Sequence, residues 1–331
     1  MKNKIFIFFL YFLVIIYLTD KILAFINKTR IDFTEKRTVI LAEHMPLIDM
    51  TILPGNDDMS NSDSLVRKRY RLRTDEHGYI MPSKIHDKPD ITMVFLGGST
   101  TECLFVSEEN RFPYFAGRIL EKETGKKINS YNSGVAGNNS RDSLNILLNK
   151  VLALRPDIVI MMHGINDIQQ LLYEKVYFSK DYLVKYDFYR IFKRIVKISI
   201  PNIHMHLTSI INSVILPKFP DKLASGETSK IIIDKNKLSN KFRMNLEMFV
   251  NICKVRRIIP VLMTQQNRLK DNSDKVVKDE MREFEINSGI SYREYKELFD
   301  LFSDTIRDVG RDNDILIIDL SKEIPQEKEY M

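Results

Sequence analysis

The stretch Ile91–Glu102, ITMVFLGGSTTE, decides how the rest of the chain is interpreted. Its apolar run from Ile91 to Leu96 is typical of a buried parallel strand, and the two glycines that follow permit a tight turn into a helix. A hydroxyl at Ser99 then stands at the carboxyl end of a sheet, beside the positive end of a helix dipole. Open α/β folds place their chemistry there, which makes Ser99 a candidate nucleophile. The alternative is that the glycine-serine pair only forms a turn.

The composition is that of a globular protein with one large domain and additions. The chain has 331 residues, of which 44% are apolar and 28% charged. A net charge of +6 is modest for this size, and no basic stripe with interleaved aromatics favours nucleic-acid binding. The two cysteines, Cys103 and Cys253, provide no disulfide framework, and their apolar neighbours predict buried free thiols.

The N-terminal segment predicts a membrane anchor. Residues Ile5 to Thr19 form an unbroken apolar and aromatic run, and after Asp20 and Lys21 the apolar pattern continues to Ile26. If the charged pair lies at the interface, this length is sufficient to span a bilayer. A cleaved signal peptide is the rival interpretation, but small residues that would form a cleavage site are missing after the run. We therefore expect a single-pass anchor over residues 1–26, with basic residues on both sides that leave its orientation poorly specified.

The remaining chain is expected to contain a stalk and lead-in at 27–89, followed by a main domain at 90–331. Five apolar runs in the main domain alternate with helical patterns and predict a parallel sheet covered by helices on both faces: 91–96, 128–131, 158–162, 258–263 and 315–318. An insertion is expected at about 171–239. Within it, residues 188–197 predict a basic amphipathic helix, which suits an anionic membrane surface or, alternatively, caps the domain's own core.

Three of the predicted strands end in residues that form a chemical set. Ser99 follows the first strand, Gly137 follows the second in NSGVAGNNS, and Asn166 follows the third in HGIND. Because parallel strands end at the same edge of a sheet, we expect these residues to converge. A serine can act as nucleophile, while a glycine N–H and an asparagine amide can donate to a developing oxyanion.

The segments GGSTTE, NSGVAGNNS and GIND resemble blocks I, II and III of the SGNH (GDSL-type) hydrolase superfamily. GGST departs from the eponymous GDS but resembles a variant found in membrane-anchored bacterial members. The resemblance covers roughly 93–319 and implies a flavodoxin-like three-layer α/β/α fold. It also implies hydrolysis of an ester, or acyl transfer from one, with Ser99 as nucleophile. The N–H of Ser99, Gly137 and Asn166 would then form the oxyanion hole.

One block of the family pattern is missing from this sequence. Family members carry a DxxH block after the last strand, in which the histidine is the general base, whereas this chain continues only with EIPQEKEYM. All six histidines precede that position: His44, His77, His86, His163, His204 and His206. His163 adjoins the third strand end, but its place in the alternation favours packing. Either the sequence is truncated before this block, or Ser99 is not activated in the usual way. For the chain as written we expect no imidazole beside Ser99 and weak hydrolytic activity.

These features together predict a membrane-anchored serine esterase that acts on acyl esters, such as O-acetyl groups of a surface glycan. The soluble domain is expected on the extracytoplasmic side. An O-acyltransferase using the same serine is a related alternative, and a degenerate SGNH domain that binds a glycan or a protein partner is another. The sequence predicts neither a cofactor nor a metal site, because His204 and His206 have strand spacing and no nearby carboxylate cluster.

Overall fold

The computed structural model describes residues 2–26, 39, 41–60, 65–173, 175–177, 200, 203, 233–271 and 273–327 of the chain. Two compact units can be distinguished, one from residues 1–35 and 179–219 and the other from residues 36–178 and 220–331. In the first unit, the described residues form helix α1 (Lys2–Ile26). No helix among the described residues combines the length and apolar character needed to cross a membrane. The fold therefore does not support the anchor predicted for residues 1–26.

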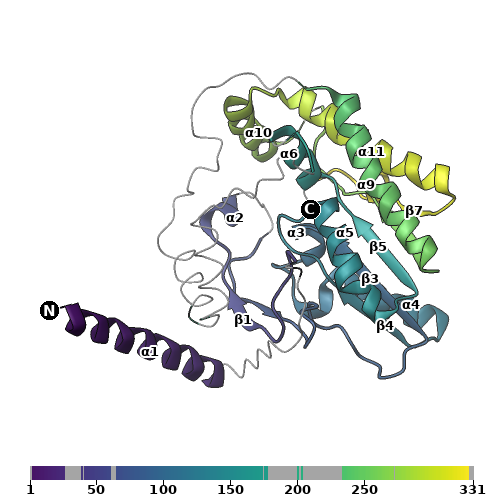
Figure 1. Ribbon diagram of the computed structural model, residues 1–331. Coiled ribbons are helices and arrows are strands. Elements are labelled where there is room, and N and C mark those ends of the chain that lie inside the picture. Colours follow the sequence, from purple (N-terminus) through teal and green to yellow (C-terminus); the bar gives the residue numbers. More distant parts are fainter. Residues whose placement is uncertain are drawn as a thin grey trace. The chain divides into compact units, whose positions relative to one another are not determined.

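A five-stranded parallel sheet forms the centre of the second unit (Figure 1). Its strands, in spatial order, are β4 (Ile128–Asn132), β3 (Ile91–Gly97), β5 (Ile158–Met162), β6 (Ile259–Met263) and β7 (Leu316–Ile318). All four neighbouring pairs run parallel. Numbered along the chain, this order is 2-1-3-4-5, the order of flavodoxin-like sheets. The α/β class and the five-stranded parallel sheet predicted from the apolar runs are confirmed.

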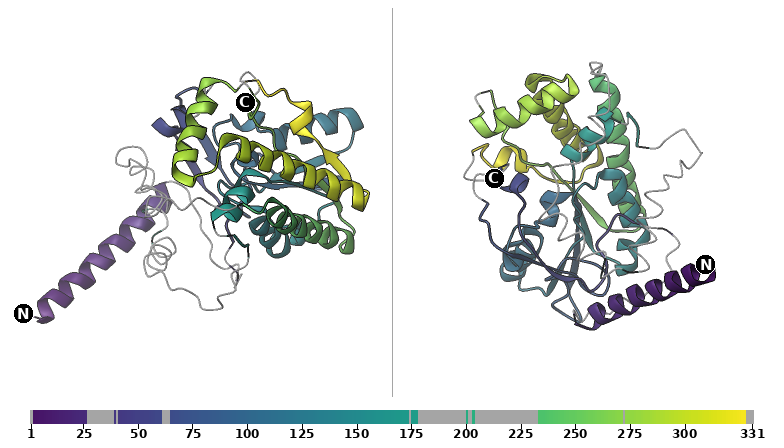
Figure 2. Two further views of the ribbon diagram at one scale, coloured as in Figure 1. Left: turned by 90° about the horizontal axis from the view of Figure 1, so that it is seen from above. Right: turned by 90° about the vertical axis from the view of Figure 1, so that its left-hand side faces the viewer.

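The strand side chains alternate between two apolar layers, as the period of two requires. In β3, Val94 and Leu96 face one layer, while Met93 and Phe95 face the other. The first layer is covered by α5 (Ser140–Asn149), α6 (Ile165–Tyr173), α9 (Lys235–Val255) and α11 (Tyr292–Asn313). The second is covered by α4 (Phe112–Thr124) and α12 (Leu320–Glu323). The two sets of helices lie on opposite sides of the sheet in Figure 2.

The helices of the main domain begin and end at local signals. Helix α4 begins at Phe112, because a 3₁₀ turn, η1 (Glu108–Asn110), precedes it and Pro113 occupies its first turn. The helix α5 ends at Asn149, and a second 3₁₀ turn, η2 (Val151–Leu154), continues from it. The sequence pattern did not predict α10 (Lys275–Ser288), whose Phe284 packs against Tyr295 of α11 with ring centroids 4.9 Å apart.

The lead-in contains a folded hairpin attached to the main sheet. Strands β1 (Asp49–Ile52) and β2 (Tyr70–Arg73) pair antiparallel, with the short helix α2 (Asn56–Ser60) between them. An isolated bridge joins Ile80 to Asn132 of β4. The fully buried Arg111 donates hydrogen bonds to the carbonyl oxygens of Arg71 (2.6 Å) and Met81 (2.9 Å). These contacts fix part of the segment predicted as a stalk to the main sheet.

Most of the predicted insertion at 171–239 lies outside the described residues, including the basic amphipathic helix expected over 188–197 and both His204 and His206.

Candidate active site

Ser99 lies where the strand order places the crevice of the sheet. The chain leaves β3, forms β4 on one side and β5 on the other, so the topological switch point lies between the carboxyl ends of β3 and β5. Gly97 at the end of β3 is paired in register with Met162 at the end of β5. Ser99 is exposed and begins the one-turn helix α3 (Ser99–Glu102), which Gly98 precedes in an extended conformation.

Asn166 approaches Ser99 from the neighbouring strand end. It is the second residue of α6, and its Nδ2 donates a hydrogen bond to the carbonyl oxygen of Asn138 at 2.8 Å. Since an amide nitrogen carries two hydrogens, one N–H remains for a ligand. A Cβ added at Gly98 would lie only 2.5 Å from Nδ2 of Asn166, so glycine at 98 is what allows this close approach.

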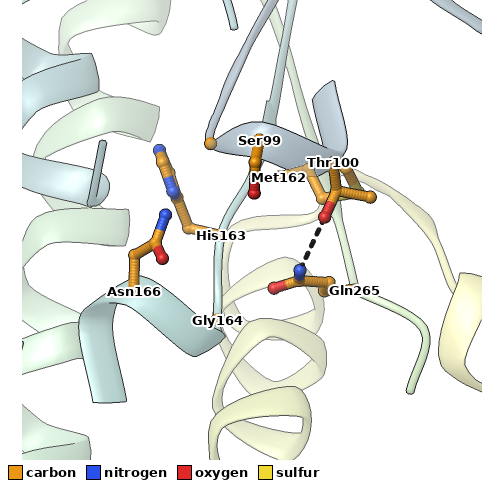
Figure 3. A pocket seen from close by; sticks show the side chains of 8 residues that line it. Ser99, Thr100, Met162, His163, Gly164, Asn166 and Gln265 are labelled. Carbon is orange, nitrogen blue, oxygen red and sulfur yellow. Dashed lines mark hydrogen bonds between the residues drawn. The ribbon is translucent and has the colours of Figure 1, made fainter. Parts of the chain in front are cut away.

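Ser99 and Asn166 line one pocket, which contains about 210 Å³ of empty space and opens to solvent (Figure 3). Its other lining residues come from the ends of β3, β5 and β6: Gly98, Thr100, Met162, His163, Gly164 and Gln265. The structure therefore brings together two of the three residues predicted from the strand ends.

Gly137 lies in the adjacent loop but does not line this pocket. Its φ of +83° is a left-handed conformation that glycine adopts readily, and its side is open, since an added Cβ would meet no atom within 4 Å. The next residue, Asn138, accepts the hydrogen bond from Asn166. Gly137 is thus the sequence neighbour of a residue that contacts Asn166, and its role as an oxyanion donor stays a prediction.

Glu102 is a residue of this region that the sequence interpretation missed. It ends α3, is buried, and accepts a hydrogen bond from the Ala136 N–H at 3.1 Å. Nε2 of His44, from the lead-in, lies 2.8 Å from the other carboxylate oxygen of Glu102. Glu102 thus connects α3 with the loop of Gly137 and with His44 of the lead-in, and no local sequence pattern marks residues so far apart as partners.

His163 is committed to a buried polar cluster rather than to Ser99. Its Nε2 hydrogen-bonds with Ser143 Oγ at 2.7 Å, and its Nδ1 lies 3.7 Å from Oδ2 of Asp167. Burial lowers the pKa of His163 to about 3, so the imidazole is neutral at pH 7. Ser143, His163 and Asp167 are residue types of a catalytic triad, and the histidine lies between the other two, as in a triad. All of them are buried, however, and the ring is directed away from Ser99 (Figure 3).

Asp167, beside Asn166, stabilises the junction of α5 and α6. Its carboxylate accepts hydrogen bonds from the N–H and hydroxyl of Ser140 and from the Tyr177 hydroxyl. Burial raises the pKa of Asp167 to about 6, although these hydrogen bonds act in the opposite direction.

Within the described ranges, no histidine side chain hydrogen-bonds to the Ser99 hydroxyl. The described residues also contain no group of three or more His, Cys, Asp or Glu side chains that could hold a metal ion.

Gln265 is the other residue that the sequence interpretation missed. It follows β6 in the segment VLMTQQ, and its side chain reaches the pocket from there. Applying the strand-end argument to this fourth strand, as to the first three, would have identified it.

Comparison with known proteins gave distant structural similarities only. No family model and no curated protein matches the chain. The chain is similar in structure to Axe2, an acetylxylan esterase from Geobacillus stearothermophilus, at 15% identity over 70% of this chain and 77% of that one, with a TM-score of 0.38. The acetyl xylan esterase AlAXEase gives 16% identity, coverage of 70% and 79%, and a TM-score of 0.39.

A further similarity is to LAE5, an alpha/beta hydrolase enzyme from the metagenome of Lake Arreo, Spain, at 15% identity, coverage of 70% and 78%, and a TM-score of 0.39. With TM-scores below 0.5, these similarities assign neither a family nor an activity to this chain.

Proposed function

We propose that this protein is a serine-dependent acyl-ester hydrolase of the SGNH type. The proposal rests on one observation, the meeting of Ser99 and Asn166 in a single pocket at the switch point of a parallel sheet. In this proposal, the Ser99 hydroxyl attacks the ester carbonyl and the alcohol leaves, after which water hydrolyses the acyl-enzyme. The N–H groups of Ser99 and Gly137 and the amide of Asn166 would donate to the oxyanion of each tetrahedral intermediate.

The pocket favours a short acyl group. Its empty space of about 210 Å³ is shared with open solvent, and its lining includes the polar side chains of Thr100, Asn166 and Gln265. A long alkyl chain would leave the second N–H of the Asn166 amide without a partner, at a cost in binding free energy. An acetyl ester on a larger alcohol such as a glycan suits the site, because the acyl group enters the pocket while the alcohol remains outside.

Activation of Ser99 is the weak point of the proposed chemistry. A serine hydroxyl is a poor nucleophile at neutral pH, and a positioned base typically contributes about 10² to 10⁴ in rate. The hydrogen bond with Ser143 holds Nε2 of His163 away from Ser99, so this imidazole does not supply that base. We therefore expect slow hydrolysis, near the roughly 10³-fold enhancement over water that a site with an incomplete triad retains.

Labelling with a serine-directed fluorophosphonate tests this proposal without knowledge of the substrate. The folded wild-type protein should gain one phosphonyl group on Ser99, located by mass spectrometry, and Ser99→Ala should gain none. Circular dichroism of both proteins controls for folding. Equal labelling of the two proteins, or no labelling of folded wild type, would contradict the proposal.

Two alternative functions predict different experimental results. A folded protein that does not react would favour a non-catalytic domain that binds a glycan or protein partner, and the commitment of His163 to Ser143 is the observation in its favour. An O-acyltransferase would instead label at Ser99 but transfer the acyl group to an added sugar acceptor. Product analysis with and without that acceptor separates transfer from hydrolysis.

Localisation is a second part of the proposal, and the sequence alone supports it. The apolar run Ile5–Thr19 lies behind two lysines in α1. We propose that residues 1–26 attach the protein to a membrane in a single-pass topology, with the domain on the extracytoplasmic side, where acylated surface glycans are found.

A further inference from the structure

One glutamine side chain connects the two strand ends that form the candidate site. Gln265 Nε2 donates a hydrogen bond to Thr100 Oγ1 at 2.9 Å, and its Oε1 accepts one from the Ile165 N–H at 3.1 Å (Figure 3 shows the first). Thr100 is the residue after Ser99, and Ile165 is the residue before Asn166. The bridge therefore joins the immediate neighbours of the nucleophile and of the amide donor.

Both ends of the bridge are places that depend on tertiary contacts. Helix α3 has four residues, too few for a helix to be stable by itself, so its orientation is set by what it contacts. Ile165 is the first residue of α6, where a backbone N–H has no acceptor within its own helix. Gln265 supplies that acceptor from another strand, and the same amide restrains α3.

The surroundings of Gln265 leave room for this bridge. A Cβ added at Gly164 would lie 3.2 Å from Oε1 of Gln265, closer than ordinary van der Waals contact. Glycine at this position thus allows the glutamine to approach the start of α6. Gln265 itself lines the pocket together with Ser99 and Asn166.

We propose that Gln265 is a positioning residue that sets the separation between Ser99 and the amide of Asn166. This inference rests on the proposed function and adds a determinant of its rate. A displacement of about 1 Å in a reacting geometry can cost roughly 10²-fold in rate. Because the bridge orients the groups that stabilise the transition state rather than binding the ground state, its loss should reduce the rate constant of the chemical step and leave binding nearly unchanged.

The decisive variants are Gln265→Met, which keeps the side-chain length and removes both hydrogen bonds, and Thr100→Val, which removes only the hydroxyl that Nε2 contacts. Thr100→Ser retains that hydroxyl and should react faster than Thr100→Val. Gln266→Met is the matched control, because Oε1 of Gln266 is buried without a hydrogen bond to any described residue. It makes the same chemical change one residue away without touching the bridge.

The assay is the concentration dependence of Ser99 phosphonylation by a small methyl fluorophosphonate, followed by intact mass, with circular dichroism as the folding control. We expect Gln265→Met to lower the limiting rate constant about 10- to 100-fold, with the half-saturating concentration changed less than about twofold. Thr100→Val should show a smaller decrease. Adding it to Gln265→Met should produce no further loss, because the contact is already gone.

The outcomes separate this inference from the proposed function. If wild type is not labelled at Ser99, the proposed function fails. If wild type is labelled and folded Gln265→Met reacts at the wild-type rate, the positioning role fails. Should Gln265→Met not fold, Thr100→Val decides, and a wild-type rate in that variant refutes the role. An equal loss in Gln266→Met would also overturn it, since the effect would then belong to the loop and not to the bridge.

Discussion

Substituting Gly98 by alanine tests how closely the amide of Asn166 must approach the nucleophile turn. The backbone of Gly98 is extended, with φ of −90° and ψ of −151°, and its φ is negative, as it is in most residues other than glycine. The Cβ of alanine, however, would lie 2.5 Å from Nδ2 of Asn166 and 3.2 Å from the carbonyl oxygen of Asn138. The first contact is too short, so one of the two groups must move.

The amide of Asn166 is the group that we expect to move, because it is the end of a side chain. Restoring ordinary contact of at least 3.4 Å requires it to retreat by about 0.9 Å. Such a displacement weakens its hydrogen bond to Asn138 and removes it from the oxyanion position. We expect a loss of about 1 kcal/mol in unfolding free energy, or roughly 2–4 °C in Tm. The Ser99 labelling rate should fall about 10²-fold.

The measurement combines thermal unfolding by circular dichroism with the rate of Ser99 phosphonylation, and a crystal structure of the variant reports the amide position directly. Gly55→Ala is the control, because its Cβ would be 3.4 Å from the nearest atom, Oδ2 of Asp58. It should leave labelling unchanged. A folded Gly98→Ala protein that labels at the wild-type rate, with the Asn166 amide in its original place, would refute the reasoning.

Three further predictions concern Asn166, His163 and the N-terminal segment. In a preparation with esterase activity, Asn166→Ala should lower turnover by about 10² to 10³ without unfolding the domain, measured as hydrolysis of an aryl acetate, and unchanged turnover would remove Asn166 from the site. The pKa of His163 is lowered to about 3, so only the unfolded chain takes up its proton below pH 6.5, and the stability that this residue contributes is present above that pH and declines as the pH falls. In urea unfolding, the difference in unfolding free energy between wild type and His163→Gln should therefore decrease by about 1.4 kcal/mol per pH unit between pH 6.5 and 4.5. The raised pKa of Asp167 gives both proteins an opposite trend, which cancels in this difference. A difference independent of pH would contradict this assignment. Finally, the full chain should stay in the membrane fraction through alkaline carbonate extraction and deletion of residues 1–28 should release it, whereas extraction of the full chain would argue against the proposed attachment.

Local patterns in the sequence were sufficient to predict the elements of the central sheet. The runs at β3, β5 and β6 became the three inner strands because each buries side chains on both faces, and an uninterrupted apolar run indicates that directly. The edge strands give weaker signals, since β4 contains Asn129 and Ser130 and Leu316 of β7 is exposed. The same reasoning located Ser99 and Asn166 at strand ends. It did not predict α10, since that helix presents few apolar side chains and its stability depends on packing against α11.

What the sequence by itself determined was therefore the set of strands and the residues that end them. The tertiary structure alone decided which ends become neighbours and what holds them there: β3 between β4 and β5, the contact of Gly98 with Asn166, the bridge of Gln265, and the burial of His163 against Ser143. The physical reason is range. The apolar pattern that predicts a strand is contained within a few consecutive residues. Each of these contacts instead joins groups from different strand ends or helices, and a hydrogen bond between such partners leaves no mark in the sequence around either one.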